Sequence, residues 1–356
     1  MTNSLQTEYD SALQRDIVKF HNNGEDYRCV AQLNDRYHLT GVLAAGGFGV
    51  IYQAEDRRLF NKKVLIKANR YNRRYLRIPN NKAVDKEVEK QRERLEHERR
   101  MLLQAGQRDI AQAPLLLDEI HDLGLDLYGP HQADDGQTHY YAKNDLWRKE
   151  PFLVLNYING LPMDAVLNTQ DRSDDSLKAA FFRNQLFFVK SFIIQTGLIL
   201  ERFHQERKTP AGDRLAFIYQ DLKPANVIFT REKNFMLIDF GSFALRINGQ
   251  TDPGFARTGT LGYQPPEFSP NFPADKIDAR ADVFTLGATV YHMLTRQAPR
   301  ADAQDQSVFD TDLLNKLPND WRNWFLKATH IDLSQRFVSM QEAVGLAYHL
   351  PVSKGS

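Results

Sequence analysis

The amino-acid sequence predicts an α+β protein in which a β-rich first part precedes a mainly helical second part. From Tyr37 to residue 158 the chain consists mostly of short alternating hydrophobic and polar runs, which are typical of strands. Beyond residue 160 the hydrophobic residues recur at helical spacing. The 356 residues suffice for one large domain or two lobes, and no internal repeat divides them.

The first part begins with residues 1–34, which are polar with weak periodicity and are interpreted as an N-terminal extension that packs on the following domain. Three alternating runs, at 37–46, 49–56 and 62–69, predict an antiparallel sheet. Residues 82–105 predict a long charged helix, because seven basic and six acidic residues mix between Lys82 and Arg100 without breakers.

The rest of the first part returns to strands. Residues 115–129 and 152–160 predict strands, and the polar stretch between them, 129–150, predicts an exposed hairpin or loop. In the second part, helices are predicted at 176–205, as one or two helices, and at 279–295 and 317–330. The predicted divisions are an extension at 1–34, a small lobe at 35–158, a large lobe at 159–350 and a tail at 351–356.

Charge and composition exclude several classes of protein. Lys and Arg number 46 and Asp and Glu 45, a net charge of +1, so a nucleic-acid or anionic-membrane partner is not expected. The single cysteine, Cys29, cannot form an intramolecular disulfide, and no secretory signal is found at the N-terminus. The longest apolar tracts, 152–158 and 187–200, are too short or too polar to span a membrane. We therefore expect a cytoplasmic protein.

The stretch AAGGFGVIY (44–52) places glycines between two strand-like runs. Backbone N–H groups there can approach phosphate oxygens that a Cβ atom would hold away. Taken alone, these residues are a weak signal, and a flexible hairpin turn is then the favoured interpretation. The stretch does not match the GxxxxGK[ST] phosphate loop, because no Lys-Ser or Lys-Thr pair follows the glycines.

Lys67 ends the apolar strand VLIK and points either to solvent or inward to an anion. Glu98, on the predicted charged helix, is the expected counter-ion, with Glu89, Glu93 and Glu96 as rivals that periodicity does not exclude. An ion pair at about 4 Å and an effective dielectric near 20 is worth roughly 4 kcal/mol before desolvation. That energy is enough to orient a lysine but not to justify burying it for stability alone. Such a pair therefore indicates a functional role.

The loop YQDLKPAN (219–226) carries three polar groups of different chemistry. Asp221 is an acceptor for a hydroxyl proton, Lys223 is a cation for a transferring anion, and Asn226 offers an amide oxygen for a hard cation. Asp239 follows the apolar run MLI and precedes Phe-Gly, so it is a second candidate oxygen ligand for magnesium. Either aspartate alone would pass as an ordinary turn residue. Together, in this order, they favour a catalytic site.

These motifs resemble those of the protein kinase superfamily, over about residues 37–345. AAGGFGVIY is similar to the glycine-rich nucleotide loop, VLIK to the strand with the nucleotide lysine, YQDLKPAN to the catalytic loop and DFG to the magnesium motif. GTLGYQPPE (259–267) resembles the substrate-side loop, and DVFTLG (282–287) resembles a buried helix. The resemblance implies a two-lobed kinase fold and an internal ion pair between Glu267 and Arg336.

The resemblance also implies roles in phosphoryl transfer with ATP and Mg²⁺. Lys67, held by Glu98, would bind the α- and β-phosphates, and Lys223 would steady the γ-phosphate. Asp221 would orient the acceptor hydroxyl, and Thr260 would contact both Asp221 and Lys223. The implied catalytic residues are Asp221, Lys223, Lys67, Glu98 and Thr260, and the implied metal ligands are Asn226 and Asp239.

Adenine would stack between Ile51, Leu65 and Ile228, with hinge hydrogen bonds from the backbone at 156–158 and Leu155 as gatekeeper. The implied nucleotide-binding residues are Leu43, Ala44, Ala45, Gly46, Gly47, Phe48, Gly49, Ile51, Leu65, Lys67, Leu155, Asn156, Tyr157, Ile158 and Ile228. Two departures lie here, since Ala44 replaces the first glycine of the loop and Leu65 stands where alanine is usual.

The substrate class follows from the same resemblance. Lys223, two residues after Asp221, and the Gly-Thr-x-x-Tyr segment at 259–263 are similar to serine/threonine kinases, so protein substrates are expected. Small-molecule kinases are the weaker interpretation, because they generally lack this segment. A pseudokinase acting as a scaffold or allosteric ATP-binding module is the alternative, although Lys67, Asp221 and Asp239 are all retained.

The catalytic loop departs from the family at two positions. Tyr219 occupies the usual histidine position, and Gln220 replaces the arginine that in many kinases binds a phosphorylated activation loop. Because glutamine cannot pair with a phosphate as arginine does, we predict activity that needs no such phosphorylation. Ser242, Thr251 and Thr258 remain candidate autophosphorylation sites.

Two polar stretches stand outside the motifs. The run KANRYNRRYLR (67–77) holds five basic residues and no acidic one, and is interpreted as a solvated insertion. Docking of an acidic partner or nucleic acid is the less favoured alternative, and the 129–150 loop has the same status. A regulatory partner is left open, as are the physiological substrate and the oligomeric state.

Overall fold

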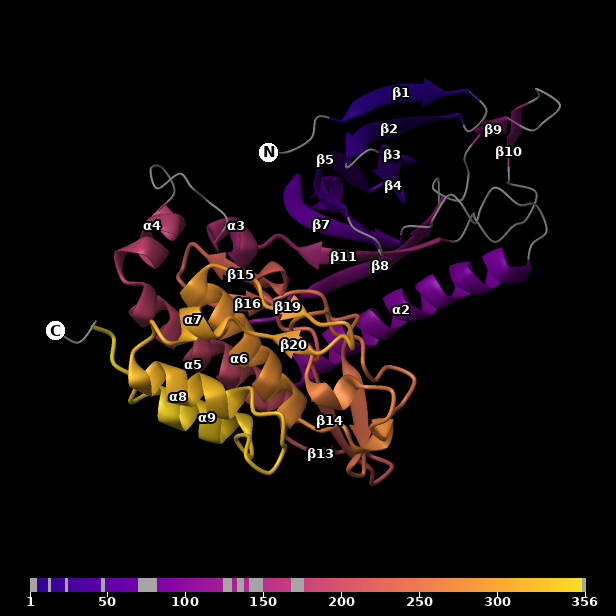
Figure 1. The fold of residues 1–356 in the computed structure, drawn as a ribbon. Coiled ribbons are helices and arrows are strands. Elements are labelled where there is room, and N and C mark those ends of the chain that lie inside the picture. The colour runs from indigo at the N-terminus through magenta and orange to yellow at the C-terminus, as the bar shows by residue number, and fades with distance from the viewer. Residues whose placement is uncertain are drawn as a thin grey trace. The chain divides into compact units, whose positions relative to one another are not determined.

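The computed structural model describes residues 5–11, 14–22, 25–45, 49–69, 82–123, 130–132, 138–140, 150–167 and 176–353 (Figure 1). The chain divides into two compact units, Met1–Arg100 with Leu115–Tyr157, and Met101–Pro114 with Ile158–Ser356. Both helices and strands are well represented, so the predicted mixture of helix and strand is confirmed. Among the described residues, no helix has the length and apolarity needed to cross a bilayer.

The first unit is built on a six-stranded sheet in the order β4-β5-β6-β7-β11-β8. The antiparallel pairing of β5 with β6 and of β6 with β7 confirms the sheet predicted between residues 37 and 69. The helix α2 confirms the predicted charged helix. The bounds are β4 Gln32–Leu33, β5 Tyr37–Ala45, β6 Gly49–Asp56, η1 Arg57–Leu59, β7 Lys62–Asn69, α2 Lys82–Gln107, β8 Leu116–Asp122 and β11 Glu150–Asn156.

The predicted hairpin between residues 129 and 150 is described only in part. Pro130–Gln132 (β9) pairs antiparallel with Thr138–Tyr140 (β10), as a hairpin requires. The remaining residues of that stretch, and residues 70–77 of the basic run, lie outside the described residues.

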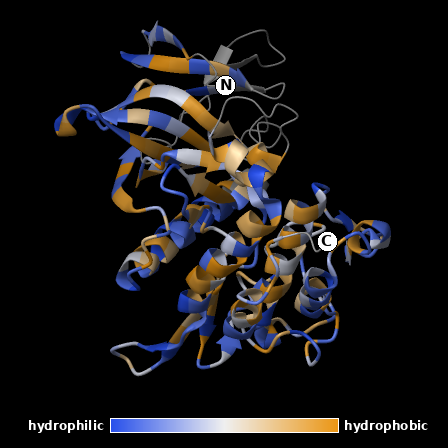
Figure 2. Ribbon diagram, turned by 90° about the vertical axis from the view of Figure 1, so that its left-hand side faces the viewer, coloured by the Kyte–Doolittle hydropathy of each residue, from blue (hydrophilic) through white to orange (hydrophobic). Residues whose placement is uncertain are grey.

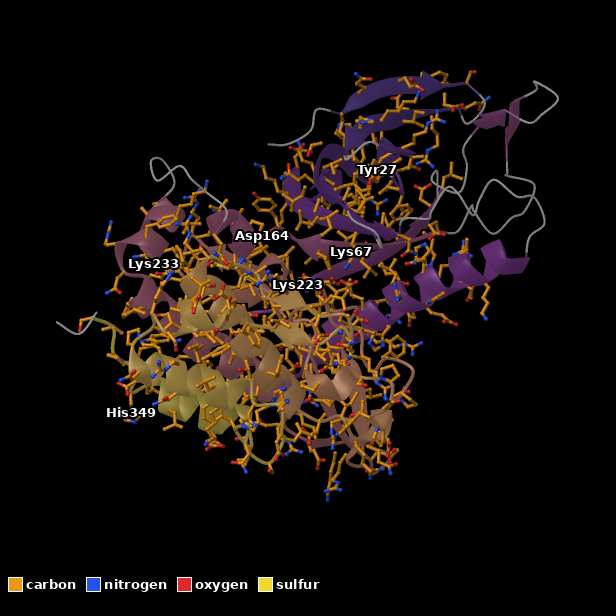
Figure 3. All side chains as sticks on the ribbon, viewed as in Figure 1. Tyr27, Lys67, Asp164, Lys223, Lys233 and His349 are labelled. Carbon is orange, nitrogen blue, oxygen red and sulfur yellow. The ribbon has the colours of Figure 1, made fainter. Side chains whose placement is uncertain are left out.

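A second sheet of three antiparallel strands, β1 Gln6–Asp10, β2 Arg15–Asn22 and β3 Glu25–Val30, precedes the first. Hydrophobic and hydrophilic residues alternate along the strands of this unit (Figure 2). Phe20 stacks on Tyr27 with ring centroids 4.5 Å apart, and it meets Tyr52 of β6 edge-on at 6.0 Å. Tyr27 is labelled in Figure 3. The two sheets therefore share one hydrophobic core.

These three strands were not predicted from the sequence. Residues 1–34 were expected to form a polar extension that packs on the following domain, and the shared core shows this packing. One signal was available, because Asn-Gly at 23–24 joins two hydrophobic runs and Asn-Gly is the strongest short-range hairpin signal. The predicted division at residue 34 stays a prediction.

An ion pair ties this N-terminal sheet to β8. Arg15 donates to both carboxylate oxygens of Asp122, at 2.6 and 3.0 Å, and the backbone N–H of Asn34 donates to the same carboxylate at 2.7 Å. Burial opposes ionisation of Asp122, but these hydrogen bonds outweigh burial and hold its pKa below the usual value. The carboxylate therefore needs Arg15 as long as it stays buried.

The second unit is mainly helical and carries three small sheets. Strands pair as β12-β15-β16, β13-β14-β17-β18 and β19-β20. The predicted helices at 176–205, 279–295 and 317–330 correspond to α4 with α5, to α6 and to α8, so all three predictions are confirmed. The helices are α3 Met163–Leu167, α4 Ser176–Arg183, α5 Gln185–His204, α6 Arg280–Thr295, α7 Thr311–Leu314, α8 Asn319–Ala328 and α9 Met340–Ala347.

Short strands and 3₁₀ turns lie between the helices of the second unit. The strands are β12 Gly160–Pro162, β13 Arg207–Lys208, β14 Arg214–Ile218, β15 Val227–Thr230, β16 Phe235–Leu237, β17 Ala244–Ile247, β18 Gln250–Thr251, β19 Arg300–Ala301 and β20 Ser307–Val308. The 3₁₀ turns are η3 Pro224–Asn226, η4 Pro266–Phe268 and η5 Ala274–Lys276. Every residue of α6 from Ala281 to Leu294 is buried, including the polar residues Asp282, Thr285, Thr289 and His292.

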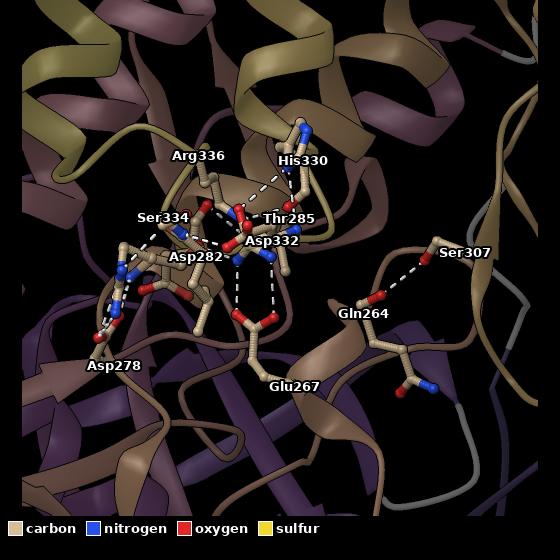
Figure 4. A network of polar contacts seen from close by, with 12 residues as sticks. Gln264, Glu267, Asp278, Asp282, Thr285, Ser307, His330, Asp332, Ser334 and Arg336 are labelled. Carbon is tan, nitrogen blue, oxygen red and sulfur yellow. Dashed lines mark hydrogen bonds and ion pairs between the residues drawn. The ribbon is translucent and has the colours of Figure 1, made fainter. Parts of the chain in front are cut away.

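The ion pair predicted between Glu267 and Arg336 is confirmed (Figure 4). The Arg336 guanidinium donates to both Glu267 oxygens, at 2.6 and 3.0 Å, and both side chains are almost fully buried. Further donors of Arg336 reach the carbonyl oxygens of Arg280 and His330. The pair fixes η4 to the start of α6 and to the loop before α9.

Replacing Glu267 with glutamine is expected to lower the free energy of unfolding by about 3–5 kcal/mol, because it leaves the Arg336 charge buried without a counter-ion. Urea denaturation followed by circular dichroism measures this loss. The control is Glu206→Gln, since Glu206 pairs with Arg214 at 3.2 Å in an exposed position and the expected loss is under about 1 kcal/mol. Equal losses in the two variants would contradict the structural role of the buried pair.

Candidate active site

Lys67, near the end of β7, forms an ion pair with Glu98 of α2 (Figure 3 labels Lys67). Its Nζ atom lies 2.7 Å from Oε1 and 2.6 Å from Oε2 of Glu98. Of the rivals, Glu96 is bound by Arg99 and Arg100, while Glu89 and Glu93 are exposed. The expected partner is thus the observed one.

Three predicted catalytic residues of the second unit meet through their side chains. The Lys223 ammonium donates to Asp221 Oδ2 at 2.8 Å and to Thr260 Oγ1 at 2.5 Å. The Thr260 hydroxyl in turn donates to Asp221 Oδ1 at 2.6 Å. Asp221 is buried, so its carboxylate oxygens need these hydrogen-bond donors. The carboxylate, the cation and the hydroxyl form a closed triangle, hereafter the Asp221 triangle; Lys223 is labelled in Figure 3.

The two predicted metal ligands lie on neighbouring stretches of chain. The Asn226 side-chain amide donates to the backbone oxygen of Asp221 at 2.8 Å and to its Oδ2 at 3.0 Å. With both hydrogens on Asp221, the Oδ1 atom of Asn226 is what remains for a cation. The N–H of Ile238 donates to the Asn226 carbonyl at 2.9 Å, and Asp239 is the next residue. The backbone hydrogen bond between Ile238 and Asn226 therefore holds the chain beside Asp239 against the residue predicted as the other metal ligand.

Backbone strain occurs at two residues of this site. Gln220 has φ +67° and Asp239 has φ +66°, both in the left-handed region that non-glycine residues rarely adopt. Such conformations persist where surrounding contacts enforce them, and they gather at functional sites. The strain at these two positions fits a site built for chemistry.

Asp282, at the start of α6, holds the backbone of the catalytic loop. Its carboxylate accepts hydrogen bonds from the N–H groups of Tyr219 and Gln220, at 2.8 and 2.7 Å, and it lies 2.7 Å from His204 Nε2. The Tyr219 hydroxyl donates to the carbonyl oxygen of Ile238, which joins the catalytic loop to the residue before Asp239.

Asp282 and His204 were not predicted from the sequence. The available signal was a carboxylate inside a mostly apolar helix, because a buried charge requires partners. Those partners are largely backbone N–H groups, which no sequence pattern identifies.

Most predicted nucleotide residues of the first unit lie on adjacent strands. Leu65 pairs with Leu155 across β7 and β11, and both are buried. Ala44 pairs with Ile51 across β5 and β6. A Cβ atom on Gly49 would come within 3.0 Å of the Ala68 carbonyl oxygen, which explains the glycine there. The described members are Leu43, Ala44, Ala45, Gly49, Ile51, Leu65, Lys67, Leu155, Asn156 and Tyr157, whereas Gly46, Gly47 and Phe48 lie outside the described residues.

At the predicted hinge, the backbone N–H of Asn156 donates to the Leu115 carbonyl at 3.0 Å, and the Asn156 side chain accepts from the Leu115 N–H at 2.6 Å. The backbone N–H of Asn156 is therefore already hydrogen-bonded within the first unit. Ile228, predicted to contact adenine, lies on β15 of the second unit and is buried.

The chain matches the family model of the protein kinase domain over residues 138–340, more than half of its length. The chain belongs to the protein kinase family. The matched region contains the Asp221 triangle, Asn226, Asp239 and the Glu267–Arg336 pair, and it begins after Lys67. The predicted resemblance is thereby confirmed.

Several curated proteins are similar to this kinase chain. Serine/threonine-protein kinase A of Synechocystis sp. is 24% identical over 273 residues, which are 75% of this chain and 42% of that protein. A probable serine/threonine-protein kinase of Streptomyces coelicolor is 25% identical over 300 residues, 79% of this chain and 35% of that protein. Cysteine-rich receptor-like protein kinase 7 of Arabidopsis thaliana is 26% identical over 194 residues, 54% of this chain and 26% of that protein. The chain thus spans less than half the length of these relatives.

Proposed function

We propose that the chain is a serine/threonine protein kinase that transfers the γ-phosphoryl group of Mg-ATP to protein hydroxyl groups. The observation that carries this proposal is the Asp221 triangle, in which a threonine hydroxyl already donates to the carboxylate that would receive a substrate hydroxyl. The names of the bacterial relatives support the same substrate class.

In this proposal each residue acts through its charge and position, as phosphoryl transfer requires. Asp221 accepts the hydrogen of the acceptor hydroxyl and orients its oxygen for attack. Lys223, held at 2.8 Å from Asp221, balances the negative charge that develops on the transferred group. Lys67, oriented by its ion pair with Glu98, binds the α- and β-phosphates of ATP.

The residues present fit Mg-ATP. Asn226 Oδ1 and the Asp239 carboxylate are hard oxygen ligands, which Mg²⁺ prefers, and Ile238 holds them on adjacent chain stretches. When bound, Mg-ATP supplies the phosphoryl group together with the metal charge that shields it. We assign nucleotide binding to the predicted residues named above.

The proposal also covers the domain layout. We assign residues 35–158 to the small lobe and 159–350 to the large lobe of a two-lobed kinase fold, with 1–34 as an extension and 351–356 as a tail. The first compact unit ends at Tyr157, next to the proposed limit, but it includes residues 1–34, and Met101–Pro114 belong to the second unit. A cytoplasmic location stays a prediction from the sequence.

No described residue favours the pseudokinase alternative. Lys67, Asp221 and Asp239 are retained, and Lys67 and Asp221 each have the ionic partner that activity requires. Kinase activity is therefore the function that the site supports best.

The test is transfer of labelled phosphate from Mg-[γ-³²P]ATP to peptides that differ only in carrying Ser, Thr, Tyr or Ala at one acceptor position. We expect label on the Ser and Thr peptides, with the Ala peptide as the blank. Label confined to the Tyr peptide would overturn the substrate class. Absence of transfer from the wild-type chain, with proven nucleotide binding, would instead favour the pseudokinase.

A further inference from the structure

The side chain of Gln220 is buried among backbone groups of the segment that follows Asp239. Its Nε2 atom donates to the carbonyl oxygens of Ser242 and Phe255, at 2.6 and 2.8 Å, and lies 3.2 Å from Thr258 Oγ1. Its Oε1 atom accepts from the N–H of Arg257 at 2.8 Å. Gln220 is fully buried. We call these contacts the amide clasp.

The amide clasp holds the two ends of the segment 242–258 together. Ser242 lies three residues after Asp239, and residues 255–258 lie just before Thr260. The Thr258 hydroxyl also donates to the Ser242 carbonyl oxygen at 2.8 Å, so both ends of the segment 242–258 meet over one side chain.

The clasp is continuous with the Asp221 triangle. Gln220 precedes Asp221, and Thr258 is two residues before Thr260, which donates to Asp221. Between them, a Cβ atom on Gly259 would lie 3.2 Å from the Gln220 carbonyl oxygen and 3.0 Å from a ring atom of Phe268. Residues 258–260 therefore run closely along residues 220–221, and a shift at either contact would displace the Thr260 hydroxyl.

Only an amide satisfies this set of partners. The three groups near Nε2 offer oxygens, whereas the Arg257 N–H needs an acceptor, and glutamine supplies both donors and an acceptor. Arginine has no acceptor, and glutamate has no donor when ionised. The contacts thus explain why glutamine, and not the arginine common at this position, stands in this chain.

We propose that Gln220 is a positioning residue whose neutral amide holds the segment 242–258 so that Thr260 reaches Asp221 without any phosphate on that segment. The proposal rests on the proposed kinase function and adds to it the means of ordering the site. A phosphoryl group on Thr258 would remove the hydroxyl donor and add negative charge beside the Ser242 carbonyl oxygen, so it would oppose the clasp.

The test compares Gln220→Glu with Gln185→Glu in the full chain after phosphatase treatment. Gln185 is the matched control, because its Nε2 donates to two backbone carbonyls, of Met293 at 2.7 Å and Leu294 at 3.1 Å, outside the site. Amide hydrogen exchange over residues 242–260 reports the clasp directly, and phosphoryl transfer to a Ser peptide reports its effect on turnover.

We expect Gln220→Glu to raise the exchange rates of 242–260 at least tenfold and to lower kcat by on the order of 10- to 100-fold, because buried oxygens lose their donors. The KM for ATP should change little. Gln185→Glu should leave both readouts near wild type, and phosphatase-treated wild type should stay active. If Gln220→Glu does not fold, Thr258→Val, which replaces the hydroxyl with a methyl group, should raise exchange in the same segment.

Exchange rates within twofold of the Gln185→Glu control would overturn the clasp. So would a wild-type chain that loses most of its transfer activity on phosphatase treatment and regains it on autophosphorylation. Because exchange is measured without substrate, a chain that proves inactive still tests the clasp, and failure of the kinase function is distinguished from failure of this proposal.

Discussion

Replacing Asp221 with asparagine is expected to lower kcat for phosphoryl transfer by roughly 10²- to 10⁴-fold, the range typical of a lost acid–base group. The amide keeps the size of the side chain but loses the charge that faces Lys223 and one of the two acceptor oxygens. Lys223 and Thr260 donate to different oxygens of Asp221, so at least one of these contacts must break. Nucleotide binding should persist, because Lys67, Asn226 and Asp239 are unchanged.

The control for this prediction is Asp310→Asn, the same chemical change at the residue that caps α7. Asparagine and aspartate cap helices about equally well, so kcat should stay near wild type. Steady-state transfer rates and ATP titrations of both variants give the comparison. Asp221→Asn with turnover within threefold of wild type would contradict the assignment of Asp221 as the acceptor of the substrate hydroxyl.

Deletion of residues 1–30 is expected to abolish folding of the first unit. The deleted strands bury Ile17, Val18, Phe20 and Tyr27, and each large apolar side chain contributes about 1.5–3 kcal/mol. The summed loss, on the order of 10 kcal/mol, is comparable with the whole stability of a typical domain. Asp122 would also lose Arg15. Near-ultraviolet circular dichroism and soluble yield after expression measure the outcome.

Two single substitutions in the same sheet separate the contribution of a buried ring from that of an exposed ring. Phe20→Ala removes a ring that is 5% exposed, so it should cost about 3–5 kcal/mol of unfolding free energy. Tyr9→Ala removes a ring that is 65% exposed and should change stability by less than about 0.5 kcal/mol. A deleted chain that melts cooperatively near the wild-type temperature would show that the N-terminal sheet is dispensable.

The parts of the fold that could be predicted are those with a clear hydrophobic period. β6 alternates buried and half-buried residues along its length, and α6 is mostly apolar, so both were predicted from sequence. The N-terminal sheet was missed because charged residues interrupt its pattern. Arg15, for example, is used in an ion pair with Asp122, a partner 107 residues away. Long-range pairing of this kind leaves no local signal.

The candidate site divides in the same way. Side chains that act through their own chemistry, such as Asp221 and Lys223, could be predicted from motif spacing. For Gln220, the sequence predicted only that its side chain cannot pair with a phosphate as an arginine would. Its actual partners include carbonyl oxygens of Ser242 and Phe255, and every residue has a carbonyl, so only the folded chain identifies them.

The central claim is that Lys67, Asp221 and Asp239 act on one metal-bound nucleotide. A crystal structure of the full chain with Mg²⁺ and a non-hydrolysable ATP analogue tests it most directly. We predict Asn226 and Asp239 as metal ligands, the Lys67 ammonium on the phosphates and the terminal phosphate beside Asp221 and Lys223. A nucleotide bound elsewhere, or a complex in which Lys67 and the two aspartates face unconnected surfaces, would contradict the account.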